Sequence, residues 1–346
     1  MALRDEILEQ PGVLRGWIET QMQVVSGIAE AILSRDVQYI FLAARGSSDH
    51  AGVYAQYLFG ARNRLAVALA TPSLFTMYPQ SPRLHNALVI GISQSGQSPD
   101  IVSVIAEGRR QGAITLAITN DSDSPLALAA ELTLGVHAGP EKAVAATKTY
   151  TAQLLALAAL SVALAENKEA DLAELACVPA AVQSVLEREP EAERIAGRYA
   201  SMDHCVVLGR GYNYATAQEW ALKLKELAYV FTDVYSTADF RHGPIAIVEP
   251  GFPVLAVAPE GAVLADQLAL FSKLRDEYRA ELVIISDSDQ ALSLGDEKLR
   301  LPSRLPEWLT PIVSIVPAQL FCYHLTRFKG YDTENPRMLH KITLTE

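Results

Sequence analysis

The sequence has few cysteines and little positive charge. Its 346 residues include three cysteines, and 29 lysines and arginines stand against 40 aspartates and glutamates, which gives a formal net charge of -11. Nucleic acids and anionic membranes bind basic surfaces, so we expect neither as a partner. Cys177, Cys205 and Cys322 are odd in number and far apart, which does not suit a disulfide framework, so we expect buried thiols in a reducing cytoplasm.

Long apolar runs and metal-ligand patterns are also missing. No uninterrupted apolar stretch reaches membrane-spanning length, and the acidic first residues do not suit a secretory signal peptide. No cluster of His, Cys or carboxylates has the spacing of a metal site, so we expect neither a metal nor another cofactor. With 50% hydrophobic and 20% charged residues, the chain is typical of a cytoplasmic globular protein long enough for two domains.

What is present is an alternation of short apolar runs with longer helical patterns. This order predicts parallel sheets covered by helices on both faces, an α/β fold. We expect strands at residues 39–43, 88–92, 114–118 and 132–136, then at 205–208, 253–258 and 282–286, with a further one near 312–316. The acidic stretch Glu166–Glu193 favours a junction between two similar halves.

The two halves also share a short motif. Phe41–Ser47 matches Val206–Tyr212, and each is a predicted strand that ends in Arg-Gly before a helix, so ligands are expected at the carboxyl ends of the strands. We divide the chain into an N-terminal helical segment (1–33), a first domain (34–165), a linker helix region (166–190), a second domain (191–334) and a C-terminal tail that closes the active site (335–346).

The segment Ser93–Ser98 is rich in hydroxyls and lies where a predicted strand passes into a helix. Unpaired backbone N–H groups and the positive end of the helix dipole meet there, with Ser98 as the cap and Pro99 at the first helical position. The segment has neither nucleotide-loop pattern, Gly-x-x-x-x-Gly-Lys-Ser/Thr or Gly-x-Gly-x-x-Gly. It therefore indicates a small phosphorylated metabolite, although a polar strand-to-helix turn has the same composition.

A predicted helix, Ala217–Tyr229, carries a charged side. Glu219, Lys223 and Glu226 follow one another at spacings of three and four, whereas Lys225 points elsewhere. A solvated helix with ion pairs is one interpretation. Since apolar residues occupy nearly every side, we expect some of these charges to be buried or in a cleft, where a carboxylate with a raised pKa can move protons.

Two other segments carry candidate chemistry. His242 precedes the turn Gly243-Pro244, where a histidine either packs or acts as a general acid and base. The tail Asn335–Glu346 contains Lys341 and ends on the β-like run Ile342–Thr345. Chain ends usually fray, but this amphipathic tail can dock and place Lys341 in a pocket.

Taken together, these motifs resemble the isomerase portion of glucosamine-6-phosphate synthase, a tandem pair of sugar isomerase (SIS) domains. The resemblance covers essentially the whole chain, and it implies a flavodoxin-like αβα sandwich in each half and a homodimer with shared active sites. The matching segments are Glu6–Pro11, Ala44–Ser48, Ser93–Gly96, Ala145–Lys148, Glu219–Glu226, His242–Pro244, Lys329–Gly330, Asn335–Arg337 and Lys341.

The resemblance also implies a role for each candidate residue. Lys341 would form an imine with the open-chain sugar, Glu226 would move a proton between carbons 1 and 2, and His242 of the other subunit would open the ring. To attack, Lys341 must be neutral, and a cation such as Lys148 or Lys223, or desolvation, would lower its pKa from about 10.4. The sugar phosphate would be held by Ser48, Ser93, Gln94, Ser95, Ser98, Val144, Ala146 and Lys223.

The chain departs from the synthases in several places. It starts Met1-Ala2-Leu3, so we expect no glutaminase domain and no ammonia drawn from glutamine. Ala146 stands where the synthases have a hydroxyl residue, Phe231 where some have histidine, and Ser98 replaces threonine. We therefore predict a deaminase that converts an amino-sugar phosphate, first of all glucosamine 6-phosphate, to fructose 6-phosphate and ammonia.

Two alternatives stay open at this point. One is another enzyme of this architecture, either a phosphosugar isomerase or a deglycase. The other is a non-catalytic sugar-phosphate-binding regulator, which the joint presence of Glu226, His242 and Lys341 disfavours. The preferred hexosamine phosphate, allosteric activation and assembly beyond a dimer are not set by the sequence.

Overall fold

A computed structural model describes residues 2–166, 168–303 and 305–341. The described residues fall into two compact units. The first-sheet unit comprises Gly12–Glu141, Lys148–Ala176 and the tail from His340, and the second-sheet unit comprises the residues up to Pro11, Lys142–Thr147 and Cys177–Leu339.

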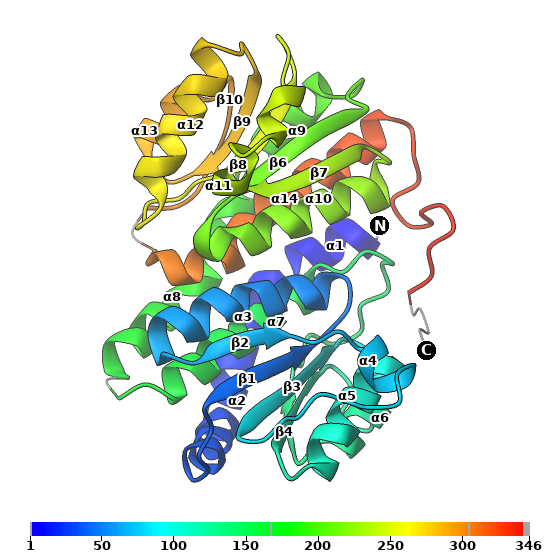
Figure 1. Cartoon of the computed structure of the whole chain (residues 1–346). Helices are drawn as coiled ribbons and strands as arrows, with labels where there is room; N and C mark the ends of the chain where they lie inside the picture. The colour runs from blue at the N-terminus through cyan, green and yellow to red at the C-terminus, as the bar shows by residue number, and fades with distance from the viewer. Residues whose placement is uncertain (1, 167, 304, 342–346) are drawn as a thin grey trace. The chain divides into compact units, whose positions relative to one another are not determined.

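The first-sheet unit is built on five parallel strands in the order β2-β1-β3-β4-β5 (Figure 1). The strands are β1 (Tyr39–Ala43), β2 (Ala66–Leu69), β3 (Ala87–Ser93), β4 (Ile114–Thr119) and β5 (Leu132–Gly135). The helices with residues in this unit are α2 (Gln10–Leu33), α3 (Ser47–Asn63), α4 (Ser73–Thr76), α5 (Pro99–Arg110), α6 (Pro125–Ala129), α7 (Lys148–Ala163) and the start of α8 (Glu169–Leu186).

Helices cover both faces of this sheet because successive side chains of a buried strand alternate between the faces. On one face Val89 of β3 packs in a cluster with Val104 and Ile105 of α5. On the other face α3 approaches β1 so closely that a Cβ added to Gly52 would stand 2.7 Å from a methyl group of Leu42. All seven residues of β3 are buried, as expected for a central parallel strand.

The second-sheet unit repeats this plan. Its parallel sheet has the order β10-β9-β8-β6-β7, which read in chain order is the same 2-1-3-4-5 arrangement as in the first sheet. The strands are β6 (His204–Gly209), β7 (Phe231–Ser236), β8 (Pro253–Val257), β9 (Glu281–Ser286) and β10 (Glu297–Arg300). The expected α/β fold with two helix-covered parallel sheets is thus confirmed.

The helices of this unit also lie on both faces. A cluster around Phe271 and Leu274 packs α12 against one face of the sheet, while α10 and α14 lie against each other on the other face (Figure 1). The elements are α1 (Ala2–Leu8), the end of α8, α9 (Glu189–Arg198), α10 (Tyr214–Leu227), α11 (Thr237–Phe240), α12 (Leu264–Asp276), α13 (Asp289–Leu294), α14 (Thr310–Phe328) and the 3-10 turns Gly211–Asn213, Pro244–Ile247 and Glu307–Leu309.

The strand expected near Ile312–Val316 is wrong, because these residues lie inside α14. Every residue of α14 from Thr310 to Thr326 is buried, and a helix buried on every side shows no amphipathic period from which to recognise it. The stretch Glu307–Phe328 is long and apolar enough to cross a membrane, but its most apolar window is fully buried inside the protein, as in a core helix.

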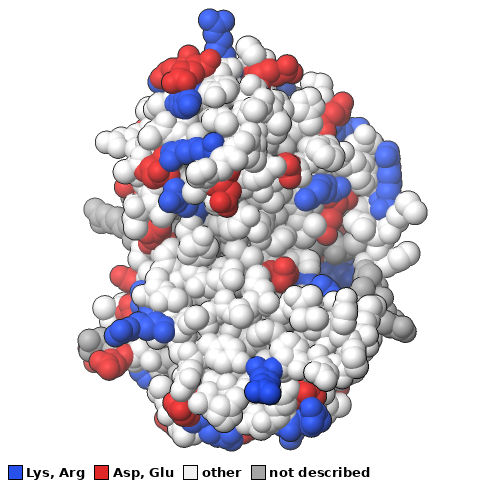
Figure 2. All heavy atoms as spheres, viewed as in Figure 1, with Lys and Arg blue, Asp and Glu red and all other residues white. Residues whose placement is uncertain are grey.

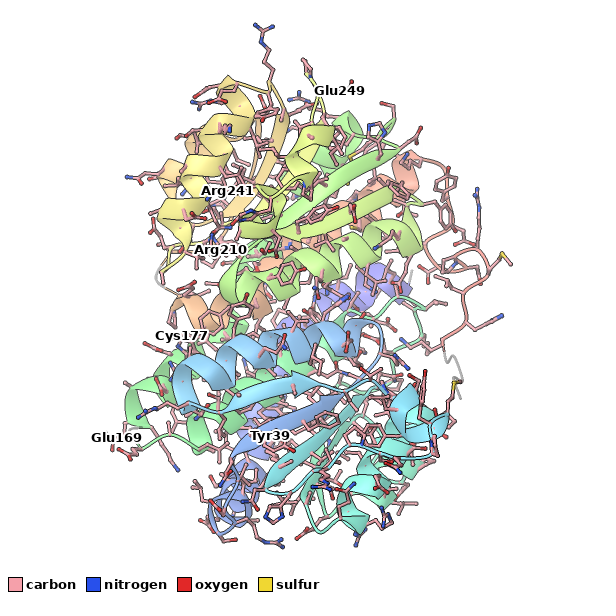
Figure 3. The ribbon with its side chains drawn as sticks, viewed as in Figure 1. Tyr39, Glu169, Cys177, Arg210, Arg241 and Glu249 are labelled. Carbon is pink, nitrogen blue, oxygen red and sulfur yellow. The ribbon has the colours of Figure 1, made fainter. Side chains whose placement is uncertain are left out.

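The cysteine prediction is right for two of the three thiols. Cys205 and Cys322 are buried, and burial raises the pKa of the Cys205 thiol to about 12. Cys177 is exposed on α8, so its expected burial is wrong (Figure 3). None of the three forms a disulfide in the described part of the chain.

On the face of the molecule in Figure 2, acidic and basic side chains are interspersed.

Candidate active site

The serine loop, Ser93–Ser98, follows β3 at the carboxyl edge of the first sheet. β3 lies beside β1, and between these two strands the strand order reverses. Ligands of open parallel sheets bind at the carboxyl ends of such a strand pair. The segment after β1 contains Ser48, which is 8% exposed in the first turn of α3. The structure therefore places both predicted phosphate-binding segments at the same edge of one sheet.

Backbone hydrogen bonds shape the loop itself. The N–H of Gly96 donates to Oγ of Ser93 at 3.1 Å, and the N–H of Gln97 donates to Oγ of Ser95 at 3.3 Å. Since both serine oxygens accept bonds, their hydroxyl protons can still be donated to an anion. Gly96 has φ +62°, and a Cβ there would stand 2.1 Å from Oγ of Ser124, so the turn requires glycine.

The helix that follows adds the positive end of its dipole. Ser98 is the cap of α5 and Pro99 follows it, as expected, and the Ser98 side chain makes no capping hydrogen bond within the described chain. Asp100 in the first turn is fully buried, and its Oδ2 accepts bonds from Nε and Nη2 of Arg45 at 2.9 Å and 2.8 Å. Arg45 thus ties the β1 loop to the β3 loop and offsets a carboxylate that would repel phosphate.

Val144 and Ala146 lie in the short segment Lys142–Thr147, which belongs to the second-sheet unit. Both side chains are half-buried and alternate with buried Ala143 and Ala145. The carboxylate of Glu6 holds this segment, since Oε1 accepts from the N–H of Lys142 at 2.5 Å and Oε2 from the N–H of Ala143 at 3.2 Å. The segment is therefore fixed through its backbone.

The charged side of α10 forms a buried cluster, as the sequence predicts. Nζ of Lys223 lies 3.4 Å from Oε1 of Glu219 and 2.5 Å from Oε2 of Glu226. The side chains of Lys223 and Glu219 are 2% and 0% exposed, Glu226 is 24% exposed, and Lys225 points to solvent. Burial alone would lower the pKa of Lys223, but the two carboxylates outweigh burial and raise it. Glu226 is thus the partly accessible carboxylate of the cluster.

His242 is exposed on the loop after α11. Its neighbour Arg241 is anchored, since Nη1 lies 2.7 Å from Oδ1 of Asp266 and Nη2 donates to the Asp266 backbone oxygen at 2.6 Å. Arg210, which follows β6, pairs with the same carboxylate, and both arginines are labelled in Figure 3. The contacts of Arg241 with Asp266 therefore anchor the loop next to the exposed imidazole of His242.

Lys341 lies in the first-sheet unit, together with the serine loop. Its Nζ donates to Oε2 of Glu141 at 2.7 Å. Glu141 is completely buried and also accepts from Oγ1 of Thr149 at 2.7 Å and from the Thr149 N–H at 3.1 Å. The sequence predicts that a cation or desolvation tunes this amine, and Glu141 could not be predicted, because it is a single acid after Gly139-Pro140 with no motif of its own.

The tail that leads to Lys341 is held by two aromatic rings of the second-sheet unit. The guanidinium carbon of Arg337 lies 4.4 Å from the centre of the Tyr229 ring and 4.9 Å from that of Tyr331, and the Arg337 N–H donates to the Tyr229 hydroxyl at 2.7 Å. The predicted β-like run Ile342–Thr345 lies outside the described residues.

The corresponding edge of the second sheet has different contents. At the strand pair β6 and β8, Oε2 of Glu307 accepts from the N–H of Ala262 at 2.8 Å. A Cβ added to Gly261 would stand 2.2 Å from the carboxyl carbon of Glu307, so this side chain fills the turn. The second sheet thus has a carboxylate of its own chain at its reversal point.

The structure divides the predicted site residues between the units. Ser48, the serine loop and Lys341 belong to the first-sheet unit, while Lys142–Thr147, Lys223, Glu226 and His242 belong to the second. Among residues 2–166, 168–303 and 305–341, no group of three or more His, Cys, Asp or Glu could hold a metal ion.

Comparisons with known proteins agree with this architecture. The family model of the SIS domain matches the chain twice, at residues 35–163 and 199–327. Glutamine–fructose-6-phosphate aminotransferase (isomerizing) of Aquifex aeolicus strain VF5 is 32% identical over 345 residues, which are 99% of this chain and 57% of that relative. The chain therefore spans little more than half the length of this relative.

Two solved structures are similar over nearly the whole chain. A candidate phosphosugar isomerase from Silicibacter pomeroyi DSS-3 is 32% identical with a TM-score of 0.86, over 96% of this chain and 99% of that chain. Glucosamine-6-phosphate deaminase from Thermotoga maritima has a TM-score of 0.78 over 100% of both chains, and at 21% identity this likeness shows the fold alone.

Proposed function

Because the chain belongs to the SIS-domain family, we propose that it is an amino-sugar phosphate deaminase that converts glucosamine 6-phosphate and water to fructose 6-phosphate and ammonia. The observation that carries this proposal is the contact of Lys341 with the buried carboxylate of Glu141 in the unit of the serine loop. A binding protein needs the loop hydroxyls but has no use for an amine held on a buried carboxylate.

The serine loop supplies the binding energy of the proposed reaction. The hydroxyls of Ser93 and Ser95 donate to the phosphate, and the N-terminus of α5 adds its dipole. Ser48 and Ser98 belong to the same edge of the sheet and complete the set of hydroxyl donors. Such a grip fixes the far end of an open-chain sugar and leaves carbons 1 and 2 to the catalytic groups.

The proposed chemistry is a proton transfer followed by an exchange of amines. His242 opens the ring, and Glu226 takes the proton from carbon 2 of the aldehyde and returns it to carbon 1, which leaves an imine at carbon 2. The amine of Lys341 adds to carbon 2 and ammonia leaves. Water then hydrolyses the lysine imine and releases the ketose, so one water is consumed for each ammonia.

A protonated amine cannot attack a carbon, and the carboxylate of Glu141 is placed to remove the proton. The Lys341 ammonium must lose a proton first, and the carboxylate of Glu141, 2.7 Å away, is in position to accept it. Thr149 at the start of α7 holds both oxygens of Glu141, so the acceptor is fixed in place. We therefore assign Glu141 the role of receiving the Lys341 proton.

We further propose a homodimer in which His242 acts in the active site of the other subunit. The imidazole is exposed on an anchored loop, which suits a residue delivered to a neighbouring molecule. Mixing inactive His242→Ala chains with inactive Lys341→Ala chains should restore part of the activity by forming hybrid dimers. No recovery from the mixture would contradict a shared site.

The test of the reaction is the release of ammonia and ketose phosphate from glucosamine, galactosamine and N-acetylglucosamine 6-phosphates. Lys341→Ala should abolish both products while sugar-phosphate affinity stays within about tenfold, because the loop provides most of the ground-state binding. The matched control is Lys298→Ala, an exposed lysine on β10, which should keep full turnover. Absence of ammonia from all three substrates would refute the deaminase.

A second candidate is a phosphosugar isomerase that releases no ammonia. The similarity to the Silicibacter pomeroyi protein favours it, since that protein is described as a candidate phosphosugar isomerase. Interconversion of glucose 6-phosphate and fructose 6-phosphate without ammonia release from any hexosamine phosphate would select this function instead.

A further inference from the structure

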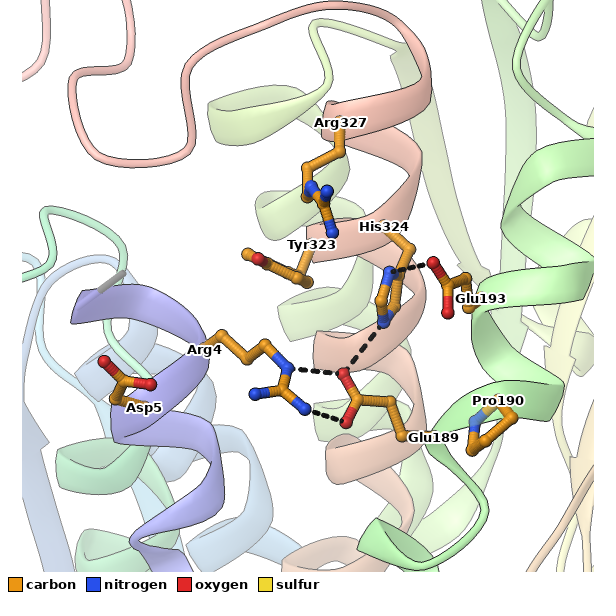
Figure 4. A pocket seen from close by; sticks show the side chains of 8 residues that line it. All are labelled: Arg4, Asp5, Glu189, Pro190, Glu193, Tyr323, His324 and Arg327. Atoms are coloured by element: carbon orange, nitrogen blue, oxygen red, sulfur yellow. Dashed lines mark hydrogen bonds and ion pairs between the residues drawn. The ribbon is translucent and has the colours of Figure 1, made fainter.

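A polar cavity of about 530 Å³ lies in the second-sheet unit, between α1, the start of α9 and the last turns of α14 (Figure 4). Its wall contains four carboxylate or guanidinium residues of α1 and α9, one histidine, one tyrosine and one further arginine: Arg4, Asp5, Glu189, Glu193, His324, Tyr323 and Arg327. The proposed reaction uses none of them. The volume falls within the range of small-molecule sites, roughly 300–1,000 Å³.

The floor of the cavity is a fixed hydrogen-bond network around Glu189. Its Oε1 accepts from Nε of Arg4 at 2.8 Å and lies 3.0 Å from Nε2 of His324, and its Oε2 accepts from Nη2 of Arg4 at 2.7 Å. Burial acts to raise the pKa of Glu189, but the bonds from Arg4 and His324 outweigh it and lower that pKa. His324 is 3% exposed, so this floor is built into the protein.

The wall also contains guanidinium N–H groups that do not bond to Glu189. Nη1 of Arg4 takes part in none of the bonds to Glu189. The Arg327 side chain is exposed and makes no hydrogen bond or ion pair within the described residues, and its guanidinium carbon lies 5.7 Å from the centre of the Tyr323 ring. Figure 4 shows this guanidinium extending along α14 toward Tyr323 and His324.

The acceptors of the wall are carboxylates. Asp5 lies beside Arg4 on α1, and Oε1 of Glu193 lies 3.7 Å from Nδ1 of His324. Carboxylates at the rim accept hydroxyl hydrogens, guanidinium groups bind phosphate oxygens in a planar fork, and a tyrosine ring offers an apolar face for C–H groups. A phosphorylated sugar presents all three kinds of group.

We propose that this cavity is a second sugar-phosphate-binding site, separate from the serine loop. Arg327 and the free edge of Arg4 take the phosphate, and Asp5 and Glu193 take the hydroxyls. The site does not depend on the proposed reaction, because it shares no residue with the serine loop, Glu226, His242 or Lys341.

The experiment is calorimetric titration with glucose 6-phosphate in a Ser93→Ala/Ser95→Ala background, which removes two of the three hydroxyls of the serine loop. Residual binding is expected, and adding Arg327→Ala should weaken it at least fivefold because a charge-assisted contact to phosphate is lost. The control is Arg275→Ala, an arginine in the last turn of α12 that forms an ion pair with Asp276. A smaller effect of Arg327→Ala, or no residual binding in the background, would overturn the proposal.

A second measurement uses the wild-type protein, so it does not depend on folding of the loop variant. The ring resonances of His324, assigned by their loss in His324→Gln, should shift on titration with glucose 6-phosphate and shift less with glucose alone. Inorganic phosphate that binds as tightly as glucose 6-phosphate would identify a simple anion site and overturn the sugar assignment. Failure of ammonia release leaves this result unaffected, so the two proposals fail separately.

Discussion

Replacement of Lys223 by methionine tests whether the buried charge cluster of α10 stabilises the fold. The Lys223 side chain is 2% exposed and pairs with Glu219, which is 0% exposed, and with Glu226, which is 24% exposed. Removing the cation leaves two carboxylates close together in a largely dry environment. Breaking a buried pair in this way costs about 3–5 kcal/mol of unfolding free energy, whereas a methionine fills a similar volume.

The measurement is urea unfolding followed by circular dichroism at pH 8. Lys223→Met should lower the midpoint by the equivalent of about 3 kcal/mol or more, roughly a hundredfold in the equilibrium constant. Lys225→Met, two positions away and exposed, should stay within about 0.5 kcal/mol of wild type. The double variant Glu219→Gln/Lys223→Met should recover part of the loss, because the buried negative charge goes with its partner. Equal midpoints for the two lysine variants would refute the reasoning.

The same cluster predicts a pH dependence. The pKa of Lys223 is raised in the folded state above its ordinary value of 10.5. Its stabilising contribution is therefore fully present below this ordinary value of 10.5 and is lost as the pH rises through the folded pKa. The difference in midpoint between wild type and Lys223→Met should be constant from pH 7 to 9 and shrink at the alkaline end of the range (~pH 10.5 and above). A difference that grows with pH would contradict the sign.

Three further variants test the site. Gly96→Ala places a Cβ 2.1 Å from a serine hydroxyl, so it should weaken fructose 6-phosphate binding in calorimetry by about tenfold or more. The control is Gly112→Ala, at a similar positive φ but with open space around the added Cβ, which should leave binding unchanged. Glu141→Gln should slow borohydride trapping of the Lys341 imine about tenfold while affinity changes less than about threefold, and an unchanged trapping rate would remove its role as proton acceptor. Arg337→Ala should slow trapping without affecting unfolding, and normal trapping would show that the aromatic contacts do not position the tail.

The central strands could be predicted because they are buried on both faces. β3 and β4 are buried along their whole length and give continuous apolar runs in the sequence. Strands β2, β7 and β10 were missed, and all three lie at sheet edges with a largely or partly exposed burial pattern. Exposure breaks the apolar run, so an edge strand of four to six residues resembles a loop.

The site was predictable where its residues are neighbours in sequence. The serine loop and the cluster of α10 are local patterns, and their positions at a sheet edge and on a buried helix are confirmed. The pairs Arg45 with Asp100 and Glu141 with Lys341 are 55 and 200 positions apart. Such pairs form because the order of the strands and the course of the C-terminal tail bring distant residues together. No rule based on spacing along the chain can predict these contacts.

Glu307 has a consequence for the way the duplicated halves differ. A carboxylate tethered to the turn has a very high effective concentration there, so a dissolved phosphate at millimolar concentration would compete poorly for the N–H of Ala262. The second sheet therefore keeps the strand order at which ligands usually bind, but the carboxylate of Glu307 takes the place of an external anion. Because a side chain of the same chain occupies the turn in the second half, only the turn of the first half offers its hydroxyls to an external anion in the proposed reaction.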